Sequence, residues 1–124
     1  MPKKVIIFDN DEDMLSICHD ILSKLGWEVH TRNICTGLIS TLENIQPSVI
    51  LIDNDIHDLG GVIATQTIKS HCTLKDIPVI YFSAHHQIKI LAEKAGADTY
   101  LEKPFKIKEL EKVITSAYMS ANKS

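Results

Sequence analysis

The stretch Val49-Ile50-Leu51-Ile52-Asp53 consists of four apolar residues followed at once by an acidic one. An apolar run without alternation is typical of a strand that is covered on both faces, as in a parallel sheet. Two further runs of this kind are Val5-Ile6-Ile7-Phe8 and Val79-Ile80-Tyr81-Phe82. These three runs predict the central strands of one buried parallel sheet.

Amphipathic helix patterns separate the predicted strands. Apolar residues recur every three or four positions at Met14, Ile17, Ile21, Leu22 and Leu25, then at Leu38, Ile39, Leu42 and Ile45, and finally at Ile107, Leu110, Val113, Ile114 and Ala117. Further helices are predicted over residues 62–70 and 87–95, and further strands over 27–31 and 98–101. Parallel strands need crossovers that cover the sheet, so the sequence predicts an α/β fold with helices on both faces of a five-stranded sheet.

The 124 residues are predicted to form a single domain, with a core over about 3–118 and a polar tail over 119–124. A net charge of -3 with scattered basic residues argues against nucleic-acid binding. The apolar run over residues 5–8 is too short for a signal peptide or a membrane span, so we expect a cytoplasmic protein without membrane insertion. Three separated cysteines, Cys18, Cys35 and Cys72, indicate mostly buried, reduced thiols.

Polar side chains follow the predicted strands, at the edge where functional groups gather in an open parallel sheet. The strand ends are Asp9-Asn10-Asp11-Glu12-Asp13, Asp53-Asn54-Asp55, Ser83-Ala84 and Lys103-Pro104. Clustered carboxylates suit a hard divalent cation such as magnesium. Together with one lysine and one hydroxyl, they form a candidate phosphoryl site.

Each of these segments also has a simpler structural interpretation. The acidic run over residues 9–13 could simply cap the first helix, and Glu12 and Asp13 are expected to do so. Ser83 and Lys103 could be ordinary loop residues. Asp53 is different, because an idle charge directly beside a buried strand would be costly. The convergence of four strand ends favours a functional cluster.

The chain resembles the receiver domain of response regulators from Lys3 to about Ala117. The residues that carry the resemblance are Asp53 followed by Asp58-Leu59-Gly60-Gly61, then Ser83-Ala84, Tyr100 and Lys103-Pro104-Phe105. The resemblance implies a flavodoxin-like, doubly wound sheet with strand order 2-1-3-4-5. It also implies a Lys-Pro peptide bond that is commonly cis.

The resemblance implies a phosphoacceptor and its partners. Asp53 would take a phosphoryl group from a phosphohistidine of a sensor histidine kinase or a histidine phosphotransfer protein, or from acetyl phosphate. Lys103 and Ser83 would hold the phosphoryl oxygens. Ser83 and Tyr100 would form a switch that remodels the face of the fourth helix and fifth strand toward a downstream protein target. No separate substrate turnover is expected, so the chain is not predicted to be an enzyme.

Magnesium is the cofactor that the resemblance implies, held by Asp9, Asn10, Asp53 and the main-chain carbonyl of Asp55. The family usually has two adjacent carboxylates at the first strand end, whereas this chain has Asp9-Asn10. An amide oxygen can ligate magnesium but brings no charge, so we expect a lower affinity. Asp11 is the alternative ligand, and the sequence leaves the choice between Asn10 and Asp11 open.

Two histidine positions also depart from the family pattern or lie close to its site. His57 stands where the family often has proline, and His85 lies two residues beyond Ser83, where side chains commonly face the attacking water. His85 and the adjacent His86 are interpreted as surface imidazoles, because neighbouring loop residues rarely share one metal ion.

Two other functions fit part of the pattern. The first strand and its acidic end also fit the Asp-x-Asp motif of haloacid-dehalogenase-like phosphatases, with Asp9 as nucleophile and Asp11 as general acid. Such enzymes need a further acidic pair after the lysine, and only Glu109 and Glu111 follow here, on a predicted helix. The third interpretation, supported by Asn10, is an inactive pseudo-receiver that acts only through protein contacts.

Overall fold

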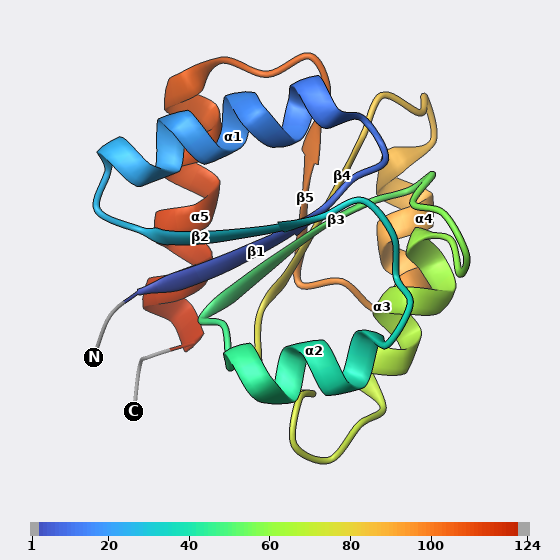
Figure 1. Cartoon of the computed structure of the whole chain (residues 1–124). Coiled ribbons are helices and arrows are strands. Elements are labelled where there is room, and N and C mark those ends of the chain that lie inside the picture. Colours follow the sequence, from blue (N-terminus) through green and yellow to red (C-terminus); the bar gives the residue numbers. More distant parts are fainter. Residues whose placement is uncertain (1–2, 122–124) are drawn as a thin grey trace.

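Strands and helices alternate along the chain, as the sequence predicted. The computed structural model describes residues 3–121 (Figure 1). Its elements are β1 (Lys4–Phe8), α1 (Glu12–Lys24), β2 (Glu28–Arg32), α2 (Leu38–Ile45), β3 (Val49–Asp53), α3 (Gly61–Lys69), β4 (Val79–Ser83), α4 (Ile88–Ala95), β5 (Thr99–Glu102) and α5 (Ile107–Ala121).

The strands form one parallel sheet in the order β2-β1-β3-β4-β5. The predicted α/β class and strand order are therefore confirmed. In the register of the sheet, Ile7 lies opposite Leu51, and Ile52 opposite Tyr81. Asp9 directly follows β1, and Asp53 is the last residue of β3. Because β1 and β3 are neighbours, the two residues lie beside each other at the carboxyl edge of the sheet.

The two faces of the sheet are covered by different helices (Figure 1). On one face, Val5 and Ile7 pack in a core cluster with residues of α1 and α5. On the other, Ile6 and Phe8 pack with residues of α2 and α3, while Tyr81 packs with α4. Each fully buried large apolar side chain contributes about 1.5 to 3 kcal/mol relative to exposure. The unbroken apolar runs thus reflect a sheet buried on both sides, which is a rigid base for the loops at its edge.

The predicted apolar stripe of the first helix was partly wrong. Its buried residues are Leu15, Cys18 and Leu22, whereas Ile17 is 51% exposed and Leu25 is 36% exposed. Successive side chains of a helix point about 100° apart, so Ile17 does not lie on the buried face that carries Cys18. In α5, Ile107 is likewise exposed, at the first turn, before the helix reaches the core.

The ends of the first and last helices also differ from the predictions. Asp11 is the N-cap of α1, and its side chain accepts hydrogen bonds from the N–H groups of Asp13 and Met14. The expectation that Glu12 and Asp13 cap the helix was wrong, because both lie in its first turn. Helix α5 continues to Ala121, so residues 119–121 of the predicted polar tail are helical. The rest of that tail, 122–124, lies outside the described residues.

The cysteines bear out the prediction of mostly buried, free thiols. Cys18 and Cys35 are buried and Cys72 is exposed, and all three are free. Burial raises the pKa of both Cys18 and Cys35 to about 11, so these thiols stay protonated and behave as small apolar groups. Within residues 3–121, no helix is long and apolar enough to cross a membrane.

Candidate functional site

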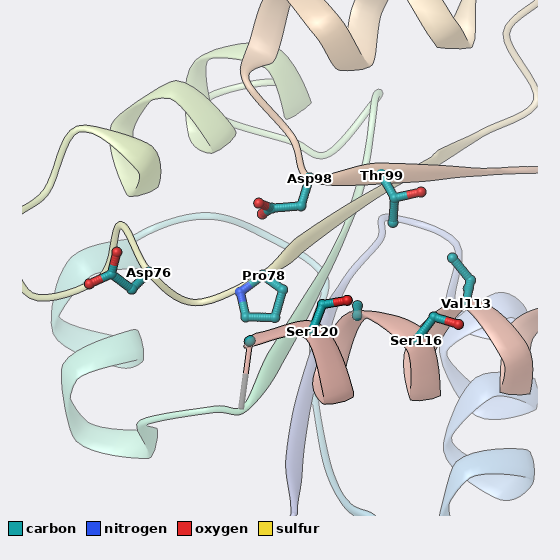
Figure 2. Close-up of a pocket in the computed structure, with 9 residues that line it drawn as sticks. Asp76, Pro78, Asp98, Thr99, Val113, Ser116 and Ser120 are labelled. Atoms are coloured by element: carbon teal, nitrogen blue, oxygen red, sulfur yellow. The ribbon is translucent and has the colours of Figure 1, made fainter. Parts of the chain in front are cut away.

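A surface cavity of about 320 Å³ lies at the amino-terminal edge of β4 and β5, against α5 (Figure 2). Asp76, Pro78, Asp98 and Ser116 are among its lining residues. Neither of its two carboxylates is buried. The residues that the sequence singled out lie instead at the opposite, carboxyl edge of the sheet.

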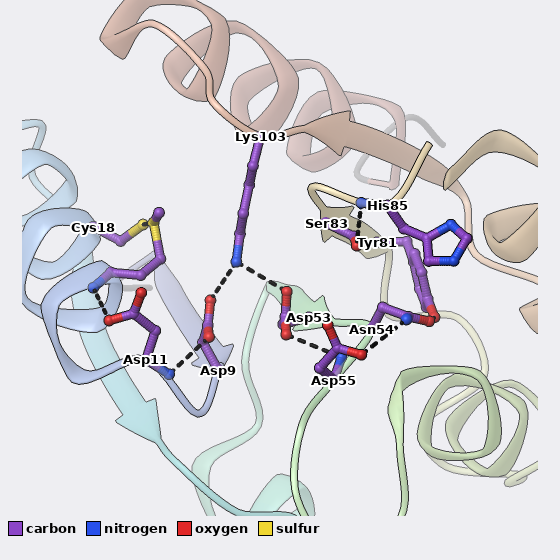
Figure 3. Close-up of polar contacts among 11 residues, drawn as sticks. Asp9, Asp11, Cys18, Asp53, Asn54, Asp55, Tyr81, Ser83, His85 and Lys103 are labelled. Carbon is purple, nitrogen blue, oxygen red and sulfur yellow. Dashed lines mark hydrogen bonds and ion pairs between the residues drawn. The ribbon is translucent and has the colours of Figure 1, made fainter. Parts of the chain in front are cut away.

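Three of those residues meet directly (Figure 3). Lys103 Nζ lies 2.7 Å from Asp9 Oδ2 and 2.9 Å from Asp53 Oδ1, so one ammonium group bridges two carboxylates. Asp9 is 1% exposed and Asp53 4% exposed. The ammonium also lies over the ring of Phe82, 4.4 Å from its centroid. The face of an aromatic ring attracts a cation, so this contact stabilises the charged lysine.

The backbone holds the other oxygen of each carboxylate. Asp9 Oδ1 accepts the N–H of Asp11 at 2.9 Å, and Asp53 Oδ2 accepts the N–H of Asp55 at 3.0 Å. A carboxylate oxygen has two lone pairs, so each of these oxygens can accept a further bond. Both side chains are therefore fixed in place but still able to bind a ligand.

The charges at this cluster do not balance. Burial raises the pKa of Asp53, and the Asp9 charge adds to that effect, while the hydrogen bond from Lys103 opposes it. Burial alone would lower the pKa of Lys103, but its hydrogen bonds with Asp9 and Asp53 outweigh this and raise it. One ammonium facing two buried carboxylates leaves an excess of negative charge, which favours an additional cation.

The loop after β3 is shaped by a close backbone approach that the sequence analysis did not detect. A Cβ atom at Gly61 would lie 2.6 Å from the main-chain oxygen of Asp53 and 2.9 Å from the hydroxyl of Tyr81, so only glycine fits there. The buried hydroxyl of Tyr81 donates to Asn54 Oδ1. A tyrosine inside the apolar run of residues 79–82 was the available signal, because a buried hydroxyl needs a partner.

The two predicted switch residues lie in different environments. Ser83 is 1% exposed at the end of β4, and its Oγ accepts the N–H of His85 at 3.0 Å. Its main-chain oxygen accepts the N–H of Lys103 at 2.9 Å, which places the two residues side by side. Tyr100, on the edge strand β5, is 40% exposed and thus separate from the buried cluster. The Lys103-Pro104 peptide bond is cis.

The adjacent histidines lie next to this strand end. The rings of His85 and His86 stack with centroids 4.7 Å apart and an angle of 13° between their planes. His86 is exposed, as predicted, but His85 is half-buried beside Ser83. The two rings therefore lie face to face in this structure.

The acidic loop after β1 divides its residues between two roles. Asp11 caps α1 through Oδ1, which accepts the N–H groups of Asp13 and Met14, so its carboxylate is turned toward the helix. Asn10 is exposed, and its Nδ2 lies 3.4 Å from His57 Nε2. This arrangement favours Asn10 over Asp11 as the side chain available for a cation.

The donor set fits a hard cation that keeps part of its water shell. Among residues 3–121, no three His, Cys, Asp or Glu side chains lie close enough together to hold a metal ion by themselves. The two buried carboxylates, the Asn10 amide and the main chain after Asp53 offer oxygen donors only. Magnesium prefers oxygen ligands and commonly takes one or two carboxylates plus waters, so the residues present fit it.

Fold and site together define a parallel α/β domain with an acidic, lysine-bridged cluster at the carboxyl edge of its sheet. The sequence model of the response regulator receiver domain matches residues 5–115. The chain therefore belongs to the receiver domain family of two-component response regulators. This membership removes the phosphatase alternative, in which Asp9 would be the nucleophile.

Three similar proteins illustrate the family. The polar-differentiation response regulator DivK of Brucella anthropi is 28% identical over 119 residues, covering 94% of this chain and 96% of that protein. Hybrid signal transduction histidine kinase C of Dictyostelium discoideum is 27% identical over 121 residues, covering 91% of this chain but 10% of that protein. The receiver domain of a sensor histidine kinase from Pseudomonas aeruginosa, crystallised with magnesium in its active-site cleft, has a TM-score of 0.87 at 21% identity, covering 96% and 99% of the two chains.

The relatives differ widely in length. The chain spans 10% to 49% of the length of seven of the curated relatives that it matches. It spans nearly the whole of DivK. A receiver domain thus occurs among these relatives both nearly alone and within longer proteins.

Proposed function

We propose that Asp53 is the phosphoacceptor of this receiver domain. The observation that carries the proposal is the bridge from Lys103 Nζ to Asp53 Oδ1 at 2.9 Å and to Asp9 Oδ2 at 2.7 Å. It holds a buried carboxylate, at the end of a central strand, next to a cation that can compensate phosphoryl charge. The loop backbone holds the second oxygen of Asp9 and of Asp53 in the same way, so the choice of Asp53 over Asp9 follows from membership of the receiver family.

The proposed reaction is a direct transfer between two protein groups. A carboxylate oxygen of Asp53 attacks the phosphorus of a phosphohistidine, an oxygen–phosphorus bond forms, and the nitrogen–phosphorus bond breaks. The imidazole leaves with the bonding electrons and takes up a proton. Lys103 stays within reach of the phosphoryl oxygens, because its ammonium already contacts Asp53.

Magnesium would be held by Asp9, Asn10, Asp53 and the main-chain carbonyl of Asp55. When bound, it supplies positive charge that offsets the negative charge of the phosphoryl group and of the carboxylates. The excess of carboxylate over ammonium charge supports this assignment. A related receiver domain from Pseudomonas aeruginosa was crystallised with magnesium in its active-site cleft.

Ser83 and Tyr100 are proposed to convert phosphorylation into a change of surface. The Ser83 hydroxyl would leave its bond with the N–H of His85 and donate to a phosphoryl oxygen. Space vacated beside Lys103 and β5 would then let the exposed Tyr100 ring turn inward. This change would alter the face of α4 and β5 toward a downstream protein target.

The proposed partners follow from the family. The phosphoryl donor would be a sensor histidine kinase or a histidine phosphotransfer protein, since the related sequences include a hybrid histidine kinase and a response regulator. We propose that the protein acts in the cytoplasm, where such donors present their phosphohistidine, and that it has no substrate of its own to turn over.

Labelling with radioactive acetyl phosphate and magnesium tests the proposal. We expect wild-type protein to be labelled on the peptide that contains Asp53, and Asp53→Asn to abolish the label while the circular dichroism spectrum is unchanged. Asp98→Asn, at the other edge of the sheet, is the matched control and should be labelled normally. A label on Asp9 would refute the assignment, and a wild-type protein without any label would be a pseudo-receiver.

A further inference from the structure

We propose that His57 is a positioning residue for Asn10, holding the side-chain amide so that its oxygen is presented to a cation. The proposal rests on the magnesium site of the proposed function. Asn10 is the position at which this chain departs from the family's two adjacent carboxylates, and His57 stands where the family often has proline.

The contact selects one orientation of the amide. Asn10 Nδ2 lies 3.4 Å from His57 Nε2. We place the His57 proton on Nδ1, because only an imidazole nitrogen with a lone pair can accept from the NH2 end of the Asn10 amide. Within residues 3–121, Asn10 Oδ1 accepts no hydrogen bond. The amide oxygen is therefore the atom left for another ligand.

Contacts from a third loop fix the place of His57. Its backbone forms an isolated parallel bridge with Ile34, in the loop between β2 and α2. In the same two loops, the Thr36 hydroxyl donates to the Asp58 carboxylate. These contacts hold the backbone of His57 and the side chain of the next residue, Asp58, against the loop after β2, so the exposed His57 ring is carried by a braced loop.

An amide needs such orientation more than a carboxylate does. A carboxylate has two equivalent oxygens, so rotating it by half a turn still presents an oxygen to a cation. The same rotation of an amide presents an NH2 group, which carries partial positive charge and cannot ligate magnesium. A residue that holds the NH2 group on the far side thus matters for Asn10 and would not matter for an aspartate there.

Calorimetric titration with magnesium alone tests this in a double-mutant cycle. We expect His57→Ala to weaken magnesium binding by about fivefold in the natural chain, since groups that orient a metal ligand commonly affect affinity on this scale or above. In the Asn10→Asp background, the same change should alter affinity by less than about twofold. Equal losses in both backgrounds would overturn the proposal, because His57 would then act without the amide.

Two further variants separate this role from a general effect on the loop. His57→Gln keeps an acceptor oxygen for the Asn10 amide and should recover most of the lost affinity, whereas no recovery would contradict the hydrogen-bonding role. His19→Ala removes an exposed imidazole on α1 and should bind magnesium as the natural chain does. Circular dichroism of each variant checks that the fold is intact.

The outcomes also separate this proposal from the function on which it rests. If the natural chain binds magnesium and His57→Ala binds it equally well, the positioning role is refuted and the proposed site stands. If the natural chain binds no magnesium, both the site and the role of His57 are refuted.

Discussion

Each edge of the sheet holds a lysine in contact with aspartate, and the two groups differ in net charge and in burial. At the carboxyl edge, Lys103 lies between Asp9 and Asp53, which are both almost completely buried. At the amino edge, Lys69 Nζ lies 2.6 Å from Asp98 Oδ2, and the Asp98 side chain is 46% exposed. The same two residue types therefore occur in very different environments.

The pair at the amino edge is fully balanced. One ammonium faces one carboxylate, and Lys69 also donates to the main-chain oxygens of Lys75 and Ile77. Asp98 accepts the N–H of Val79 at 2.8 Å. Each group has partners within the protein, so this pair connects the start of β4 to α3 and leaves no net charge for a ligand.

The cavity beside Asp98 shows that shape alone does not identify the functional site. It has a volume of about 320 Å³ and lies against the amino edge and α5 (Figure 2), yet it contains no unbalanced buried charge. The carboxyl edge has two buried carboxylates and one ammonium (Figure 3). An excess of buried charge is costly unless a ligand compensates it, which makes it the better sign of function.

The strongest contrast is expected from removing each lysine. Lys103→Ala should lower the rate of phosphoryl transfer from acetyl phosphate by about 100-fold, because it removes a positioned cation from the phosphoryl oxygens. Magnesium binding should persist or improve, since the competing ammonium is gone. Lys69→Ala should leave the transfer rate unchanged. A large loss of magnesium binding in folded Lys103→Ala would contradict this role.

Adding a third carboxylate should increase the charge excess at the carboxyl edge. At an effective dielectric near 20, one unit-charge pair about 4 Å apart is worth about 4 kcal/mol, and a divalent ion doubles that gross attraction. Desolvation and repulsion from Asp9 and Asp53 cancel much of it, leaving about 1 to 2 kcal/mol. We therefore expect Asn10→Asp to bind magnesium roughly tenfold more tightly by calorimetry. Equal affinities would mean that Asn10 does not face the metal, and Asp11 would become the preferred ligand.

Neutralising the phosphoacceptor should stabilise the fold at neutral pH. The pKa of Asp53 in the folded protein lies above its ordinary value of 3.8, chiefly because of burial, so its ionised form disfavours folding. The destabilisation is absent below that ordinary value and grows as the pH rises through the folded-state pKa. We expect Asp53→Asn to raise the free energy of unfolding by about 1 kcal/mol at pH 7 and not at pH 3. Urea unfolding at the two pH values checks this, and a loss of stability at pH 7 would contradict it.

The smallest effect is expected at the amino edge. Asp98→Asn keeps an oxygen for the N–H of Val79 but loses the charge that faces Lys69. Because the pair is partly exposed, we expect a loss of about 0.5 kcal/mol or less in urea unfolding. A gain in stability, as expected for Asp53→Asn, would mean that the two edges do not differ as described.

The sequence by itself determined the alternation of elements and the positions at which functional residues follow the strands. Burial on both faces leaves unbroken apolar runs, and helices that cover a sheet show a period near 3.6, so both signals are local. Strand ends then locate residues such as Asp53 and Lys103 without any coordinates. Local periodicity was less reliable for Ile17 and Leu25, because the side of a helix that packs depends on its neighbours.

Only the tertiary structure decided how these residues meet. Lys103 contacts partners 94 and 50 residues away, and Asn10 contacts His57 across 47 residues. The capping role of Asp11, the bridge by one lysine between two carboxylates, and the bracing of the His57 loop all depend on strand order and loop paths. Such contacts join segments far apart in the chain, so no periodicity within one segment encodes them.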